Sequence, residues 1–268
     1  MMFASDLDRT LIYSNRALSD YGVEEDIELV TVEQKLDQKV SFMSAGSLAY
    51  LQRISSKLLF VPVTTRSYEQ YRRVLLPNTL QKYAVTSNGA NILYEGMPLV
   101  DWKNKISKDI TNSSMHLGEI IEQMKDNFYI PGEMRTVEQL FVYYYLSDRI
   151  SSQLVQEIAC FLAEKGWRVS YQGNKFYLMP LSISKGEAVR FIQEREGIST
   201  LIGAGDSSFD DDFLRICQYP FVLGHGELAQ KPLKEHYQVI KEEGVKGGEM
   251  LLNSILKLIE KIQLASTP

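Results

Sequence analysis

Three short apolar runs, each followed at once by a polar or acidic residue, constrain the fold of this 268-residue chain most. They read MMFAS before Asp6, LLFVPVTT at 58–65 and LIGAGD at 201–206. Runs that are apolar on both faces are typical of central strands in a parallel sheet that helices cover on both sides. The carboxyl ends of such strands meet at one edge, where ligands bind. The three runs therefore predict an α/β sheet with a polar, ligand-binding edge.

Helical periodicity separates these runs. The segments expected to be helical are 44–55, 68–75, 185–196, 210–218 and 247–263. Strands that alternate with helices predict a Rossmann-like, doubly wound parallel sheet as the core. A long charged passage at 20–43 interrupts the alternation, and we expect it to form a small hairpin over the sheet edge.

The stretch from 89 to 181 has a different pattern. FVYYYLS at 141–147 alternates strongly, a helix is expected at 149–166, and WRVSYQ and KFYLMP flank Gly173-Asn174. A Gly-Asn pair between two alternating runs is typical of a β-hairpin. We therefore predict an inserted α+β cap domain at 89–181, with the catalytic core formed by 1–88 and 182–268, a division that a chain of this length can accommodate.

The net charge and the two cysteines argue against a nucleic-acid-binding, membrane-binding or secreted protein. The net charge of -5 and the pI near 5.4 provide no long-range attraction for nucleic acid or an anionic membrane. Cys160 and Cys217 lie in apolar contexts without metal-ligand spacing, which indicates buried thiols in a reducing compartment. The N-terminus does not read as a signal peptide, and no run approaches the roughly 18 apolar residues of a membrane span. We expect a cytoplasmic monomer or homodimer whose partner is a small molecule.

The segment Asp6-Leu7-Asp8-Arg9-Thr10 directly follows the first apolar run. In an extended backbone, residues i and i+2 project to the same side, so both carboxylates can face one small volume. Two such charges repel unless a cation or a proton lies between them, and Mg²⁺, which prefers oxygen ligands, is a natural partner. Taken alone, the same residues could serve as turn and cap residues.

At these residues the chain resembles the haloacid dehalogenase superfamily, whose first motif, Asp-x-Asp-x-Thr, is matched by Asp6, Asp8 and Thr10. The second motif, an apolar strand ending in Thr or Ser, resembles LLFVPVTTR, with Thr64 at the phosphate-binding position and Arg66 just beyond it. Thr65 stands where many relatives have glycine, which leaves open whether Thr64 or Thr65 binds phosphate.

Two later motifs extend the resemblance along the chain. A lysine at the start of a helix is matched by Lys185 in ISKGEAV, and the acidic loop is matched by Asp206 and Asp210 in GDSSFD, with Phe209 where asparagine is commoner. Each has a structural alternative, a solvated helix start for the lysine and helix capping for the aspartates. Four motifs in the right order and context are far more specific than any one of them.

The position of the insert resembles the Cof-type subgroup that includes the sucrose-phosphate phosphatases, and SNGA at 87–90 resembles its boundary between core and cap. The resemblance implies a Mg²⁺-dependent phosphatase that acts on a sugar phosphate or similar metabolite through an aspartyl-phosphate. The implied catalytic residues are Asp6 as nucleophile, Asp8 as general acid and base, Lys185 and Thr64. The implied metal ligands are Asp6, Asp8 through its backbone carbonyl, Asp206 and, in or near the second coordination sphere, Asp210. The implied substrate-binding residues are Thr10, Thr65, Arg66, Asn88 and Gly89.

Two other functions remain open from the sequence, a phosphomutase or phosphotransferase and a non-catalytic phosphate-binding module. Tyr143-Tyr144-Tyr145 could stack on a sugar, but packing within the cap is the expected role, because alternate residues of a strand face opposite sides. His116, His225 and His236 form no metal-ligand pattern, and structural or surface roles are expected for them.

Overall fold

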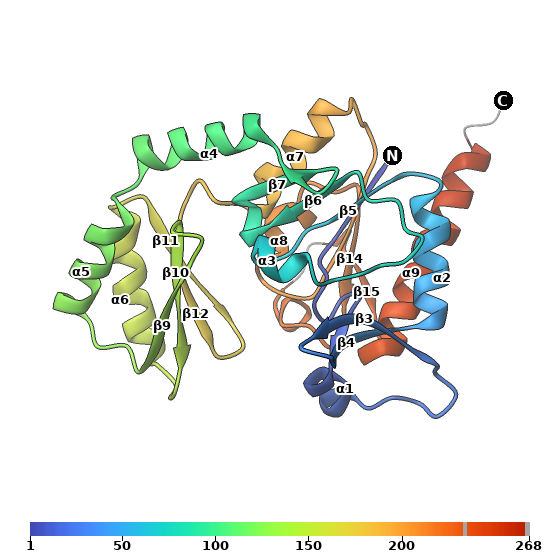
Figure 1. Ribbon diagram of the computed structural model, residues 1–268, viewed down its shortest axis with the longest axis horizontal. Helices are drawn as coiled ribbons and strands as arrows, with labels where there is room; N and C mark the ends of the chain where they lie inside the picture. Colours follow the sequence, from blue (N-terminus) through green and yellow to red (C-terminus); the bar gives the residue numbers. More distant parts are fainter. Residues whose placement is uncertain (233–234, 266–268) are drawn as a thin grey trace.

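The centre of the protein is a five-stranded sheet in which every pair of neighbours is parallel. The computed structural model describes residues 1–232 and 235–265 (Figure 1). The strand order is β15-β14-β13-β1-β5. The strands are β1 (Met2–Ser5), β5 (Leu59–Pro62), β13 (Leu201–Gly205), β14 (Tyr219–Leu223) and β15 (Gln238–Ile240). The three apolar runs of the sequence are therefore the three adjacent strands β13, β1 and β5, as predicted.

Helices cover both faces of this sheet, because its buried strands carry apolar residues on both faces. Phe3 of β1 packs on one side in a cluster with Leu51 and Leu252, whereas Met2 and Ala4 pack on the other side. The first side carries α2 (Ala45–Ser55) and α9 (Gly244–Ala265), and the second carries α7 (Lys185–Arg195) and α8 (Asp211–Leu214) (Figure 1). The Rossmann-like, doubly wound core is confirmed.

A small antiparallel sheet, the flap, lies beside the carboxyl edge of the core. It contains β2 (Tyr13–Ser14), α1 (Asn15–Tyr21), β3 (Leu29–Lys35) and β4 (Gln38–Ser44), in the strand order β2-β4-β3. The hairpin expected within 20–43 is thus present. The helix expected at 68–75 is shorter, α3 (Tyr68–Tyr71), because the chain then turns to bridge Val74 to Glu33 and to donate the Leu75 N–H to the Val32 carbonyl at 2.8 Å.

The insert forms an α+β cap. Its antiparallel sheet has the order β11-β12-β10-β9, from the strands β9 (Gly132–Val137), β10 (Phe141–Leu146), β11 (Trp167–Gln172) and β12 (Lys175–Pro180). Two helices, α5 (Leu117–Asn127) and α6 (Ser152–Ala163), cover the face of this sheet that lies away from the core (Figure 1). Alternation places Tyr144 among the buried cap residues and leaves Tyr143 and Tyr145 on the face that lacks helices. That face is free to contact a ligand.

The chain enters the cap through β6 (Tyr83–Thr86), η1 (Ser87–Gly89), β7 (Asn91–Tyr94), β8 (Met97–Pro98) and α4 (Val100–Ser113). Ile92, Trp102 and Ile106 lie within the predicted cap range of 89–181, yet they pack in the same cluster as core residues such as Val61 and Val189. Trp102 Nε1 also donates to the Gly89 carbonyl at 3.0 Å. We propose on this basis that the boundary between core and cap lies within α4.

Across the described ranges, no helix combines the length and the apolar character that crossing a membrane would need.

Candidate active site

The carboxyl ends of β1 and β13 bring two aspartates together. Parallel register pairs Ser5 with Ala204, and the Asp6 N–H donates to the Ala204 carbonyl at 2.9 Å, so Asp6 and Asp206 leave adjacent strands side by side. Both side chains are buried, with 3% and 5% of their residue surface exposed. Ligand atoms of Asp6, Asp206 and Asp210 all lie within 4.8 Å of one another. Stretches 200 residues apart in sequence thus form one acidic cluster.

Asp210 closes the loop that carries Asp206. Its Oδ2 accepts from the N–H of Asp206 at 3.0 Å, the N–H of Ser207 at 2.8 Å and the Ser207 hydroxyl at 2.9 Å. Its Oδ1 accepts from Lys185 at 2.6 Å. Gly205 is required beneath this loop, because a Cβ there would meet the Asp210 side chain. With both oxygens engaged by protein donors, Asp210 holds the loop and orients its neighbours.

Lys185 is the cation of the cluster. It is the first residue of α7, which Ser184 caps by accepting the N–H of Glu187, and its side chain is fully buried. The Nζ lies 2.8 Å from Asp6 Oδ1 and 2.6 Å from Asp210 Oδ1. Burial alone would lower its pKa, but the charges of Asp210 and Asp6 outweigh burial and raise it, so this lysine is an ammonium.

One lysine does not neutralise three buried carboxylates. Burial raises the pKa of Asp6 to about 7, with Lys185 opposing and Asp210 reinforcing the rise. Burial and the charge of Asp6 raise the pKa of Asp206 well above its ordinary value. Among the described residues, no donor reaches Asp6 Oδ2 or Asp206 Oδ1. These two orphaned carboxylate oxygens suit a hard divalent cation such as Mg²⁺, which would supply both the missing partner and the missing charge.

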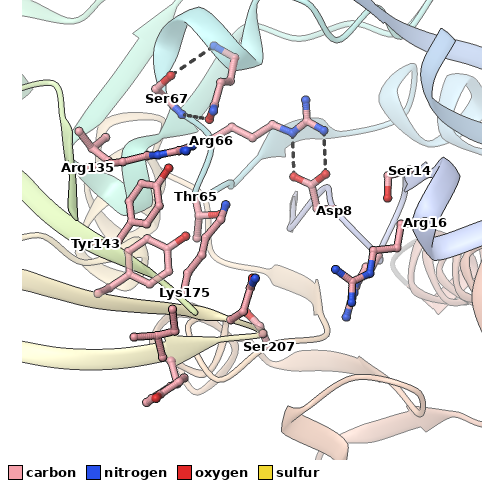
Figure 2. A pocket seen from close by; sticks show the side chains of 18 of the residues that line it. Asp8, Ser14, Arg16, Thr65, Arg66, Ser67, Arg135, Tyr143, Lys175 and Ser207 are labelled. Carbon is pink, nitrogen blue, oxygen red and sulfur yellow. Dashed lines mark hydrogen bonds and ion pairs between the residues drawn. The ribbon is translucent and has the colours of Figure 1, made fainter. Parts of the chain in front are cut away.

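The second motif contributes Thr64 and Thr65 at the end of β5. Thr64 is fully buried and its hydroxyl accepts the N–H of Arg66 at 3.1 Å, whereas Thr65 is half-buried and lines the pocket (Figure 2). Thr10 is also fully buried, and its hydroxyl has no partner among the described residues. The two threonines of the second motif thus occupy different depths, Thr64 beneath the site and Thr65 on its wall.

Asn88 and Gly89 belong to η1, on the segment that enters the cap, and neither lines the pocket. Asn88 is buried in the left-handed conformation (φ 59°) and its amide donates to Met179 Sδ at 3.5 Å. At Gly89 (φ 101°) a Cβ would collide with the carbonyl of Ser184. Close approach of the backbone to the residue before Lys185 therefore explains the glycine.

Asp8 lines the same pocket as Asp206, and its carboxylate pairs with Arg66 (Figure 2). Both contacts are 2.7 Å, from Nε to Oδ2 and from Nη2 to Oδ1. The remaining edge of the guanidinium reaches the flap, where Nη1 donates to Glu33 Oε2 at 2.8 Å. Arg66 therefore joins the first motif to the flap.

A pocket of about 1040 Å³ lies between the core edge, the flap and the cap. Asp8, Thr65 and Asp206 line its core side, and Tyr143, Tyr177, Lys175 and Arg135 line its cap side. Figure 2 shows Arg135 and Tyr143 on one side of the view and Asp8 on the other. The Tyr143 and Tyr177 rings lie 5.3 Å apart, and Lys175 Nζ lies 5.2 Å from the centre of the Tyr143 ring.

Sequence reasoning did not single out Tyr177, Lys175 or Arg135, and it assigned Tyr143 to packing. The alternation in FVYYYLS was the available signal, since Tyr143 and Tyr144 had to face opposite sides. Which of those sides faces the core could be decided only when the cap was docked. Phe209, which replaces the commoner asparagine, packs edge-on against Tyr177 at 5.2 Å and so ties the acidic loop to the cap.

Comparison with known proteins agrees with this geometry. A model of the family described as sucrose-6F-phosphate phosphohydrolase matches residues 1–243. The chain belongs to this family. It is therefore a phosphoric monoester hydrolase of the haloacid dehalogenase superfamily, of the Cof-type, sucrose-phosphatase-like group. Among curated proteins, none matches the sequence significantly.

Several solved structures share the fold of this phosphatase along nearly its whole chain. The sucrose-phosphatase from Synechocystis sp. PCC6803, in complex with sucrose and phosphate, superposes with a TM-score of 0.70 at 15% identity, covering 96% of this chain and 98% of that one. A trehalose-6-phosphate phosphatase related protein gives 0.55 at 19% identity, with 96% and 98% covered. A haloacid dehalogenase-like hydrolase protein from Bacillus subtilis gives 0.57 at 18% identity, with 96% and 91% covered.

Proposed function

We propose that this phosphatase depends on Mg²⁺ and hydrolyses a sugar phosphate or similar small phosphomonoester through an aspartyl-phosphate on Asp6. The observation that carries the proposal is the buried contact of Lys185 with Asp6, beside the unpartnered oxygens of Asp6 and of Asp206, which lines a large pocket. Such a site suits a phosphoryl group, because a cation and a lysine can offset repulsion between an anionic nucleophile and an anionic substrate.

The chemistry follows from the residues around Asp6. In the first step an Asp6 carboxylate oxygen forms a bond to phosphorus, the ester bond breaks, and Asp8 donates a proton to the departing oxygen. In the second step water attacks the phosphorus, Asp8 takes its proton, and phosphate leaves with Asp6 regenerated. Lys185 would hold Asp6 in line for attack, and Asp210 would hold Lys185.

Mg²⁺, when bound, would neutralise charge on the phosphoryl oxygens. Asp6 and Asp206 would hold it, together with the backbone carbonyl of Asp8, and Asp210 would support it indirectly through the loop. Either Thr64, beneath the site, or Thr65, on its wall, would donate a hydrogen bond to the phosphoryl group. Thr10 and Arg66 would complete the floor, and Asn88 and Gly89 would act through the backbone beneath Lys185.

The cap supports a sugar phosphate as substrate. The volume of 1040 Å³ is at the upper end of small-molecule sites, which span roughly 300 to 1,000 Å³, and so admits a disaccharide phosphate. Tyr143 and Tyr177 present adjacent aromatic rings with which a sugar ring can pack. The structural relative from Synechocystis was solved with sucrose and phosphate, which agrees with this choice. We also propose that the enzyme is cytoplasmic, acts as a monomer or homodimer, and has no nucleic-acid or membrane partner.

Phosphate release from a panel of esters tests the proposal. The panel contains sucrose 6F-phosphate, trehalose 6-phosphate, hexose monophosphates and p-nitrophenyl phosphate, each assayed with Mg²⁺ and with EDTA. We expect Mg²⁺-dependent release from at least one sugar phosphate and none from Asp6→Asn, which keeps the shape of the side chain. Full turnover by Asp6→Asn would remove Asp6 from its role, and phosphoryl transfer between sugars without phosphate release would identify a mutase.

A further inference from the structure

The flap carries a buried carboxylate that the proposed mechanism does not use. Glu33 of β3 has only 3% of its surface exposed, and it accepts three side-chain hydrogen bonds. Ser41 Oγ donates to Oε2 at 2.7 Å, Arg66 Nη1 donates to Oε2 at 2.8 Å, and Arg73 Nε donates to Oε1 at 3.1 Å. Three donors offset the cost of burying this carboxylate, so the fold accommodates Glu33 in its charged form.

Glu33 lies at an irregularity in β3. Val32 and Glu33 are both buried, at 1% and 3% exposure. The pairing of β3 with β4 shifts register between Thr31 and Glu33 and again between Glu33 and Gln34. Such irregularities re-aim a side chain at the cost of local pairing, and they are over-represented near active sites.

Glu33 is ionised in the folded protein. Burial alone would raise its pKa, but the Ser41 hydroxyl and the Arg66 charge outweigh burial and lower it. The carboxylates of Glu33 and Asp8 lie at two edges of one guanidinium, which is itself only 12% exposed. The planar fork of arginine fixes the relative orientation of the two carboxylates it bridges.

Asp8 depends on Arg66 for its orientation. Within the described ranges, the side-chain hydrogen bonds of the Asp8 carboxylate both come from Arg66. This carboxylate is 38% exposed at the pocket wall, so little else restrains it. An arginine held at one end alone could rotate, and Asp8 would rotate with it.

We propose that Glu33 is a positioning residue, which anchors Arg66 to the flap so that Arg66 holds the Asp8 carboxylate where the leaving group departs. The assignment rests on the proposed function, because it takes Asp8 to be the general acid. It makes the flap a part of the catalytic apparatus that acts through Asp8, with no contact between Glu33 and the substrate required.

A dependence on the leaving group distinguishes positioning of an acid from general support of the fold. An alkyl phosphate such as a sugar phosphate needs a proton on the departing oxygen, whereas p-nitrophenyl phosphate releases a stable phenolate and needs none. General acid catalysis contributes about 10²- to 10⁴-fold and small misplacements are costly, so we expect Glu33→Gln to lower kcat/KM for the alkyl phosphate by roughly 10- to 100-fold. We compare kcat/KM because it reports the first step, whereas the second step, in which Asp8 takes a proton from water, is common to both substrates. For p-nitrophenyl phosphate we expect a change in kcat/KM below about 3-fold, since the acid contributes little to that first step.

Two further variants test whether the effect of Glu33→Gln is specific to this residue and whether it acts through Asp8. Glu28→Gln is the matched control, because Glu28 is exposed and directly precedes β3, and both substrates should be turned over at the parental rate. In an Asp8→Asn background, Glu33→Gln should change kcat/KM for the alkyl phosphate by less than about 2-fold, because the residue through which it acts is gone. Should Glu33→Gln fail to fold, Ser41→Ala removes one donor to Glu33 and should show the same substrate dependence with smaller losses.

Equal losses on both substrates, or an undiminished effect in the Asp8→Asn background, would overturn the assignment while leaving the proposed phosphatase intact. A parent protein that releases phosphate from no ester would overturn the proposed function and this assignment with it.

Discussion

Replacement of Lys185 by methionine tests the electrostatics of the site most directly. Methionine has a similar length and a similar volume, but it leaves the buried carboxylates of Asp6 and Asp210 without the cation that lies between them. Removal of one partner of a buried ion pair costs about 3–5 kcal/mol, because a buried charge is left uncompensated. Lys185 contacts two carboxylates, so we expect Lys185→Met to lower the free energy of unfolding by about that amount at pH 7.5.

The assay is urea unfolding in EDTA, followed by circular dichroism. Lys257→Met, a change at an exposed position of α9, is the matched control and should stay within about 0.5 kcal/mol of the parent. Addition of Asp210→Asn to Lys185→Met should recover part of the loss, because one of the two facing charges is then removed. If Lys185→Met unfolded at the parental midpoint, the reasoning that this lysine compensates two buried carboxylates would be refuted.

Three further predictions concern the metal, the cap and pH. Asp206→Asn should abolish stabilisation by Mg²⁺, which for the parent should reach about 2.7 kcal/mol at a hundredfold excess over Kd; an unchanged Mg²⁺ titration of the melting temperature would exclude Asp206 as a ligand. Glu138 of the cap accepts from Ser87 Oγ at 2.8 Å and Asn91 Nδ2 at 2.5 Å of the entry segment. Glu138→Gln should therefore favour the open cap and raise KM for a sugar phosphate by about 3- to 10-fold, and an unchanged KM would show that the contact does not hold the cap. Burial lowers the pKa of His225 below 6.5. The contribution of His225 to the free energy of unfolding is therefore complete above pH 6.5 and is lost as the pH falls through the pKa of the folded protein. An NMR titration that gave this histidine a pKa above 6.5 would contradict the prediction.

The arrangement of the acidic cluster could be anticipated because parallel strands deliver their carboxyl ends to one edge. Asp6 and Asp206 each follow an apolar run, and Lys185 begins a helix directly after the insert, so their convergence followed once the sheet was assumed. The same reasoning could not separate Thr64 from Thr65, since depth depends on how the chain turns after β5. It could not find Glu33 either, since an irregular register in a charged passage leaves no trace in residue pattern.

The sequence by itself determined the doubly wound core and the motif residues, because strand alternation and short-range spacing are local properties that a linear pattern records. Only the tertiary structure decided the partner of Asp8, the packing of Phe209 on Tyr177 and the cap residues that line the pocket. These contacts join segments about 30 to 170 residues apart along different elements, and they depend on how the flap and the cap dock on the sheet edge. Docking of that kind is decided by the shape and charge of whole surfaces, which no short stretch of sequence contains.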